Sequence, residues 1–342
     1  MIPVRNIYWM LAYAFRALDK GAYERLGSEE FDNSLDLCAA ILARGVERQV
    51  KRGLTRNYLP QTETLPCIRG KVDLAASLKA NSLLKRQLVC SFDEFSIDTP
   101  ANRIVKSTMQ LLLRNADVSP ARKKDLKRLL PYLSEVQEAD VLHCDFDVPI
   151  NRNNQDYRLL LFICQLIRDG MLMSEHGNRK MSAILDDQAI CKLYERFILE
   201  YYRREHPELD ASASQVPWAL DDKATGILPI MQTDITLRRN DRILIIDAKY
   251  YTRMTQANFG TTTLHSENLY QIFTYVKNMQ QTLPAEAPTV AGMLLYARTD
   301  EPLLPDGDYR MSGNPISIRS LDLSCDFGCI RAQLDEIAAT WF

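Results

Sequence analysis

The stretch TDITLRRNDRILIIDAKYY, residues 233–251, decides the fold of the second half of the chain. Its apolar run, Ile-Leu-Ile-Ile at 243–246, is typical of a strand buried in a sheet. The run ends on Asp247 and, two residues later, on Lys249. Because charged side chains rarely enter a core unpaired, these two residues need either a partner or a chemical role.

The stretch is expected to form a β-hairpin. Asn240-Asp241 is a favoured two-residue turn, because both residue types tolerate the left-handed backbone that such a turn needs. With this turn the register sets Asp234 directly opposite Asp247. Directly opposed Cβ atoms lie about 4.5–5.5 Å apart, where two like charges destabilise the sheet. A cation between the two carboxylates would remove that repulsion.

The hairpin therefore predicts a magnesium site. Side chains alternate along a strand, so Lys249 shares a face with Asp247, while the apolar residues Leu244 and Ile246 point the other way. Two carboxylates, with the backbone carbonyl of Ala248 as a further oxygen, suit Mg²⁺. Such an ion activates water and stabilises charge on a phosphodiester, and the lysine amine can orient the nucleophile or neutralise the phosphorus centre.

A purely structural role for these residues stays open. Asp234 followed by Asp247-Ala-Lys249 is a short pattern, and a salt-bridged strand end would also produce it. A simple salt bridge has no need of the second carboxylate, which favours the metal site. The prediction depends on one register, since a turn of odd length would move Asp234 off the shared face.

Two helices are expected to support the site. The pattern at 187–205 predicts a helix with Glu195 at the margin of its buried stripe, where the carboxylate could complete the metal site or be an ordinary solvated side chain. The pattern at 266–280 predicts a helix in which Gln271 borders the core positions. Gln271 could brace the site or touch the DNA backbone, or lie on a plain helix surface.

Length and composition indicate a two-domain protein. The chain has 342 residues, 46% hydrophobic and 25% charged, with a formal net charge of −2, so it does not attract nucleic acid by bulk charge alone. We predict an N-terminal domain over 1–180, mainly helical with a β-rich insert at about 57–95, and an α/β domain over 181–342 built as a mixed sheet flanked by helices. Helices are expected at 6–18, 33–52, 100–115, 120–133, 158–173 and 328–341, and further strands near 289–297 and 315–323.

Nothing in the sequence predicts export or a membrane span. The apolar N-terminus lacks a basic leader and a cleavage site, and it is too short to cross a bilayer; Asn6 is a plausible N-cap for a core helix there. The eight cysteines are scattered, which predicts buried, reduced thiols in a cytoplasmic protein.

The residues of the hairpin and its two helices resemble the active site of the restriction-endonuclease-like nucleases. More specifically, the chain resembles the McrC family, the nuclease subunits of McrBC modified-cytosine restriction systems. Six phrases carry this resemblance, in order along nearly the whole chain: IPVRNIYWMLAYAF (2–15), TLPCIRGKVDL (64–74), DTPANRIVKSTMQLLL (98–113), LYERFILEYYRRE (193–205), TDITLRRNDRILIIDAKYY (233–251) and HSENLYQIFTYV (265–276).

The resemblance implies a division of labour. In that family the partner McrB recognises DNA with methylated cytosine, hydrolyses GTP and forms a hexameric AAA+ ring. The McrC subunit docks through its N-terminal domain, stimulates GTP hydrolysis and cuts the DNA with Mg²⁺. GTP is thus used by the partner and not bound by this chain, which has no GxxxxGK[ST] phosphate loop. The resemblance carries the catalytic role to Asp234, Asp247 and Lys249, and with them Glu195 and Gln271.

The position of the β-rich insert makes Arg69 and Lys71 candidates for contact with the ring. Two other functions stay open at this point. The chain could be a non-catalytic assembly subunit that only stimulates the GTPase, or a standalone nuclease that acts on other nucleic acid. An intact carboxylate–lysine set argues against the first, and a standalone enzyme would need its own recognition surface in the N-terminal half.

Overall fold

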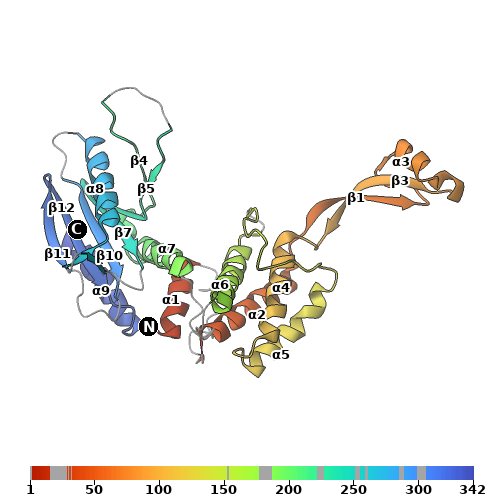
Figure 1. Cartoon of the computed structure of the whole chain (residues 1–342), viewed down its shortest axis with the longest axis horizontal. Helices are drawn as coiled ribbons and strands as arrows, with labels where there is room; N and C mark the ends of the chain where they lie inside the picture. The colour runs from red at the N-terminus through yellow and green to blue at the C-terminus, as the bar shows by residue number, and fades with distance from the viewer. Residues whose placement is uncertain are drawn as a thin grey trace. The chain divides into compact units, whose positions relative to one another are not determined.

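The computed structural model describes residues 2–15, 29, 31, 33–151, 154–176, 187–221, 227–250, 255–258, 261–284, 289–298 and 306–342 (Figure 1). The chain forms two compact units, one of residues 1–37 and 183–342, the other of residues 38–182. The boundary predicted near residue 180 falls among residues that the structure does not describe. The N-terminal helix folds with the C-terminal unit, whereas the sequence placed it in the N-terminal domain.

The first unit is built on a five-stranded mixed sheet with the strand order β11-β12-β10-β7-β6. The central strands β7 (Arg242–Lys249), β10 (Ala291–Ala297) and β12 (Asn314–Leu321) run parallel. The outer strands β6 (Ile235–Arg239) and β11 (Gly307–Met311) pair antiparallel to them. This architecture confirms the predicted mixed α/β sheet. Two short ribbons, β4 (Gln215–Val216) with β5 (Met231–Gln232) and β8 (Thr255–Asn258) with β9 (Thr261–Leu264), were not predicted.

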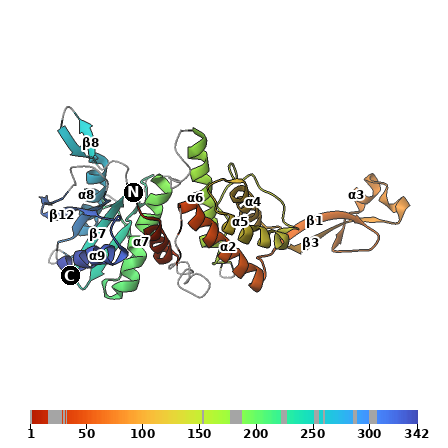
Figure 2. The same ribbon diagram turned by 90° about the horizontal axis from the view of Figure 1, so that it is seen from below.

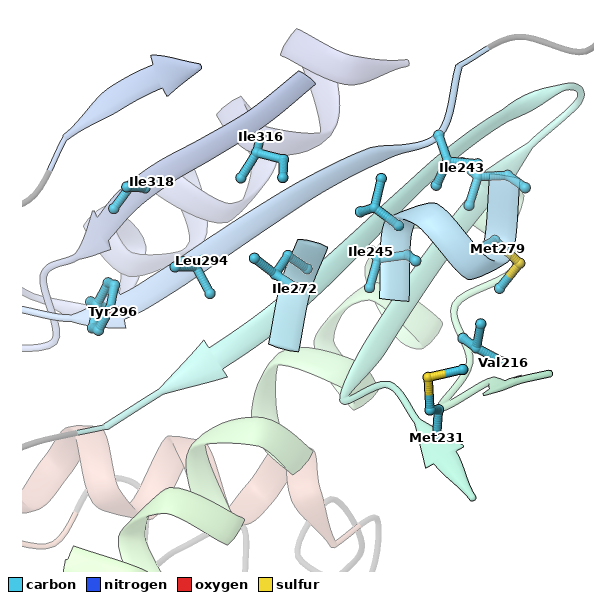
Figure 3. Packing of buried hydrophobic residues seen from close by; sticks show 12 residues of the cluster. Val216, Met231, Ile243, Ile245, Ile272, Met279, Leu294, Tyr296, Ile316 and Ile318 are labelled. Atoms are coloured by element: carbon cyan, nitrogen blue, oxygen red, sulfur yellow. The ribbon is translucent and has the colours of Figure 1, made fainter. Parts of the chain in front are cut away.

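Helices cover the sheet, and the inner strand β7 is buried on both faces. Helix α8 (Ser266–Gln281) packs against β7, β10 and β12. Its Ile272, Val276 and Met279 belong to one buried cluster with Ile243 and Ile245 of β7. Figure 3 labels Ile272 and Met279 of the helix beside Ile243 and Ile245 of the strand. Helix α7 (Asp187–Glu205) contacts β6 and β7, and α9 (Phe327–Trp341) contacts β12. A strand buried on both faces needs the continuous apolar run seen at 243–246, because neither face meets water.

Helix α1 (Val4–Ala14) lies against α7, which is why the N-terminus belongs to this unit. The Tyr13 ring contacts Phe197 with centroids 5.8 Å apart, and the Tyr13 hydroxyl donates to Glu205 at 2.8 Å. Apolar spacing in the sequence correctly predicted a core helix but gave no sign of which core it joins. Asn6 is not the predicted N-cap: Pro3 precedes the helix, and the Asn6 amide donates to the carbonyls of Leu323 and Cys325.

The second unit is a helical bundle with a projecting β arm. The bundle consists of α2 (Ser34–Arg52), α4 (Pro100–Arg114), α5 (Pro120–Leu129), η4 (Leu130–Leu133) and α6 (Tyr157–His176). The arm pairs β1 (Asn57–Leu65) and β2 (Lys71–Val72) with β3 (Leu88–Ser96), and it carries α3 (Leu74–Lys79) and η3 (Ser82–Lys85). Strands β1 and β3 run side by side away from the helices in both views (Figures 1 and 2). The predicted β-rich insert is thus confirmed, with two short helices added.

The cysteines fit their prediction only in part. All eight are free thiols, and Cys38, Cys90 and Cys164 are buried. Cys67 and Cys329 are exposed, because the first lies on the arm and the second in the first turn of α9. Among the residues that the structure describes, every helix is too short or too polar to cross a lipid bilayer.

Candidate active site

The predicted hairpin forms with the predicted register. Arg239 pairs with Arg242, and Ile235 with Ile246. Of the two turn residues only Asn240 takes the left-handed backbone, with φ 52°. The expectation that both turn residues adopt this backbone is therefore wrong for Asp241, because one left-handed residue is enough for the turn.

Asp234 lies one residue before β6, just outside the ladder. Its carboxylate reaches the end of β7, where Oδ2 accepts a hydrogen bond of 3.0 Å from the backbone N–H of Ala248. In a strand the N–H and C=O of one residue point to the same edge, so the Ala248 carbonyl also points toward Asp234. The two acidic residues and this carbonyl therefore lie at one end of β7, as predicted.

Asp247 is fully buried, with 0% of its surface exposed. The Lys249 ammonium lies 2.9 Å from each of its carboxylate oxygens, and Oδ1 accepts the hydrogen bond. Oδ2 makes no well-aligned hydrogen bond with a described residue, so its contact is the ion pair with Lys249. A buried carboxylate oxygen whose hydrogen-bonding capacity is not filled can accept a further ligand.

Burial dominates the electrostatics of this acidic pair. Loss of water raises the pKa of Asp247 and that of Asp234, and the Asp234 carboxylate raises the pKa of Asp247 further. The Lys249 ammonium opposes both shifts. The site thus holds more negative charge than one lysine neutralises, and a divalent cation would relieve the excess.

Gln271 takes part in the site and does not lie on a plain helix surface. Its Oε1 accepts a hydrogen bond of 3.3 Å from the Lys249 ammonium, and its Nε2 donates one of 2.9 Å to the hydroxyl of Tyr275. Tyr275 was missed from sequence, although it stands four residues after Gln271 and hence on the same helix face. The tyrosine fixes the amide so that its oxygen faces the lysine.

Glu195 lies within electrostatic reach of the same cluster. The α7 residue Cys191 donates a hydrogen bond of 3.0 Å to the carbonyl of Tyr250, directly after β7, so α7 runs past the end of that strand. Burial, and then the charge of Asp234, raise the pKa of Glu195 to about 7. The structure therefore brings all five predicted residues to one end of β7: Lys249 contacts Asp247 and Gln271, Asp234 accepts from the backbone beside them, and Glu195 lies near.

The side chains alone do not enclose a metal. Within the described ranges no group of three His, Cys, Asp or Glu side chains is close enough to hold one ion. The fold and the site define an α/β protein with a buried carboxylate–lysine cluster at the end of the inner strand β7.

The chain belongs to the family of McrBC 5-methylcytosine restriction system components, whose model matches residues 6–297. It is similar to the type IV methyl-directed restriction enzyme EcoKMcrBC of Escherichia coli K12, with 29% identity over 98% of this chain and 97% of that one. In a solved half-complex from a tetradecameric assembly of Thermococcus gammatolerans McrB AAA+ hexamers with bound McrC, a chain is 18% identical, with a TM-score of 0.49 over 98% of this chain and 76% of that one. A chain of the T. gammatolerans McrBC complex is 20% identical over 59% of this chain and 58% of that one, with a TM-score of 0.42.

Proposed function

We propose that this protein is the endodeoxyribonuclease subunit of a restriction system that acts on DNA containing methylated cytosine. It would hydrolyse phosphodiester bonds with Mg²⁺ in a restriction-endonuclease-like domain, as type II enzymes do. The observation that carries the proposal is Asp247: a fully buried carboxylate that shares one lysine with a second buried acid, Asp234. Membership in the restriction-system family supports DNA with methylated cytosine as the substrate of this cluster.

The donor set fits magnesium. Asp234 and Asp247 supply carboxylate oxygens, and the carbonyl of Ala248 points to the same edge of the strand. Mg²⁺ prefers oxygen ligands and keeps several waters, so it needs only one or two carboxylates from a protein. The shortage of enclosing side chains therefore suits a magnesium site that is completed by water and DNA phosphate.

The chain's own residues would position the substrate and handle protons. When bound, the ion supplies a Lewis acid and lowers the pKa of a coordinated water. Lys249, held by Asp247 and Gln271, presents its ammonium to the attacking water or to a phosphate oxygen. Glu195, with a pKa of about 7, can hold or release a proton near neutral pH.

A protein partner would deliver the DNA. We infer that the arm docks on an AAA+ GTPase, because it exposes large apolar side chains that a monomer has no reason to present. These are Tyr58, Ile68, Leu74, Leu78 and Leu84, each more than 60% exposed. The predicted contacts also lie on the arm: Lys71 is exposed on β2, and Arg69 stacks 3.9 Å from the centre of the Phe92 ring. The GTP would stay with the partner.

A reconstitution experiment separates this function from its two rivals. Methylated duplex DNA should be cut only when this chain, its GTPase partner, GTP and Mg²⁺ are all present. Cleavage without the partner would identify a standalone nuclease. GTPase stimulation without any cleavage would identify an assembly subunit with a silent site.

A further inference from the structure

The outer face of α2 carries a line of charge that the candidate active site does not use. The N-terminal half of this helix is buried, and its C-terminal half presents charged residues three and four positions apart, which places them on one face. These are Arg44, Glu47, Arg48, Lys51 and Arg52. Four of the five are cations.

One carboxylate serves three of the cations in this region. Glu47 lies 3.8 Å from Arg44, 3.2 Å from Lys51 and 3.9 Å from Arg128, which belongs to the neighbouring helix α5. A single negative charge cannot neutralise three positive ones. The contact with Arg128 also places α5 beside the charged face of α2.

A second carboxylate is shared in the same way. Asp156, just before α6, lies 3.5 Å from Arg48 and 2.7 Å from Arg52. Leaving Arg44 aside, four cations thus share two carboxylates: Arg48, Lys51, Arg52 and Arg128. These groups are exposed or partly exposed, and ion pairs at a surface add at most about 1 kcal/mol each, so stability gives little reason to gather so many cations.

Helix α5 adds further positive charge to this surface. Lys124 and Lys127 are exposed, lie three residues apart and make no ion pair with any described residue, while Arg122 pairs with Asp125. Lys124 also lies one helical turn from Arg128. We call the cations of α2 from Arg44 to Arg52, together with Lys124, Lys127 and Arg128, the basic ridge. The chain as a whole has a net charge of −2, so this positive surface is local.

The ridge has the chemistry of a phosphate-binding surface. Arginine forks bind phosphate oxygens in pairs, and lysines on long flexible stems reach them as point charges. From residue 44 to residue 52 the helix rises roughly 12 Å, enough to follow about three phosphates of one DNA strand. The carboxylates on the surface of an acidic protein are irregularly spaced, so they would match this regular row of cations less well than DNA phosphates do.

We propose that the basic ridge binds the phosphate backbone of duplex DNA without reading its sequence. This inference rests on the proposed function and adds a second DNA contact, in the unit that does not carry the candidate active site. The ridge would hold the duplex while recognition of the methylated base is left to the partner. Its binding would be governed by charge and hence by salt.

The test measures DNA binding apart from cleavage. The full chain with Asp247→Ala is titrated, without partner, into an unmethylated 30-base-pair duplex at several salt concentrations. The Lys51→Ala/Lys124→Ala/Arg128→Ala variant should bind about 10²-fold more weakly near ~0.1 M salt, with the salt slope reduced by about 2–3, the loss of three phosphate contacts. Lys51→Glu/Lys124→Glu should weaken binding further.

A matched control removes the same charge from the other unit. Arg238, Arg239 and Arg310 are exposed there, and replacing all three with alanine should leave DNA affinity within about twofold. An equal loss in this control would overturn the proposal, because bulk charge would then explain the binding. Unchanged DNA affinity in the ridge variant, with a loss of GTPase stimulation, would instead assign the ridge to a protein partner. Cleavage of methylated DNA by the unmutated chain is scored separately, so failure of the proposed function would be seen there alone.

Discussion

Lys249→Ala should destabilise the metal-free protein through the acid it leaves behind. The lysine side chain is 14% exposed, and that of its partner Asp247 is 0% exposed. Removing one member of a buried ion pair strands the other charge, which costs about 3–5 kcal/mol. The unit that contains the pair has about 200 residues. For a domain of that size each kcal/mol shifts Tm by about 2–4 °C, so a fall of roughly 6–20 °C is expected.

The loss should depend on pH. Burial raises the pKa of Asp247, and the Lys249 ammonium lowers it. Without the lysine the pKa rises further, so the folded state favours the protonated carboxyl even more. That contribution to stability is present at low pH and lost as the pH rises through the folded-state pKa. The difference in Tm between the Lys249→Ala variant and the unmutated protein should therefore be large at pH 8 and small at pH 4–5, near the ordinary pKa of Asp.

Thermal melts in EDTA at several pH values measure this effect. Asp247→Asn combined with Lys249→Ala should recover most of the loss, because the fully buried carboxylate that the lysine neutralises is then absent. Lys192→Ala, an exposed lysine on α7, is the control and should change Tm little. A Lys249→Ala protein with the Tm of the unmutated chain, or with the same loss of Tm at every pH, would show that no buried charge is left unpaired.

Three further predictions concern the surroundings of the site. Tyr275→Phe removes the acceptor of the Gln271 amide, and should lower kcat of the reconstituted complex about fivefold (the worth of about 1 kcal/mol) with KM for DNA unchanged; an unaltered kcat would contradict the positioning role. The Glu195 pKa of about 7 lies above its ordinary 4.5, so its contribution to stability is full below pH 4.5 and lost as pH rises through 7. Glu195→Gln should flatten that fall in metal-free melts, and an unchanged pH profile would contradict the shift. Gly292→Ala should cost about 1–3 kcal/mol in denaturant unfolding, because a Cβ would lie 2.8 Å from Val276 and 2.9 Å from Ile272; an unchanged midpoint would show that α8 can yield.

Local sequence was enough to predict the geometry of the hairpin. The turn at 240–241 and the alternation of side chains depend only on neighbours in the chain, and both fixed the register that the structure shows. The predicted helices at 187–205 and 266–280 correspond to α7 and α8 for the same reason, since apolar periodicity of long segments is a strong signal.

Long-range placement could not be predicted. Nothing in residues 4–14 tells that their apolar face meets α7, about 190 residues later, so the N-terminal helix was assigned to the wrong unit. Asn6 was mistaken for a cap because its true partners, the carbonyls of Leu323 and Cys325, lie at the far end of the chain. Short ribbons such as β4–β5 were missed because a strand of two residues is too short to show an alternating apolar pattern.

In the proposed function the acids at the end of β7 cut DNA. Cleavage of methylated duplex by the reconstituted complex carrying Asp247→Ala tests this role. In this variant strand scission should fall to background, while stimulation of the partner's GTPase and the fold are retained. Scission at the unmutated rate in that variant would contradict that role.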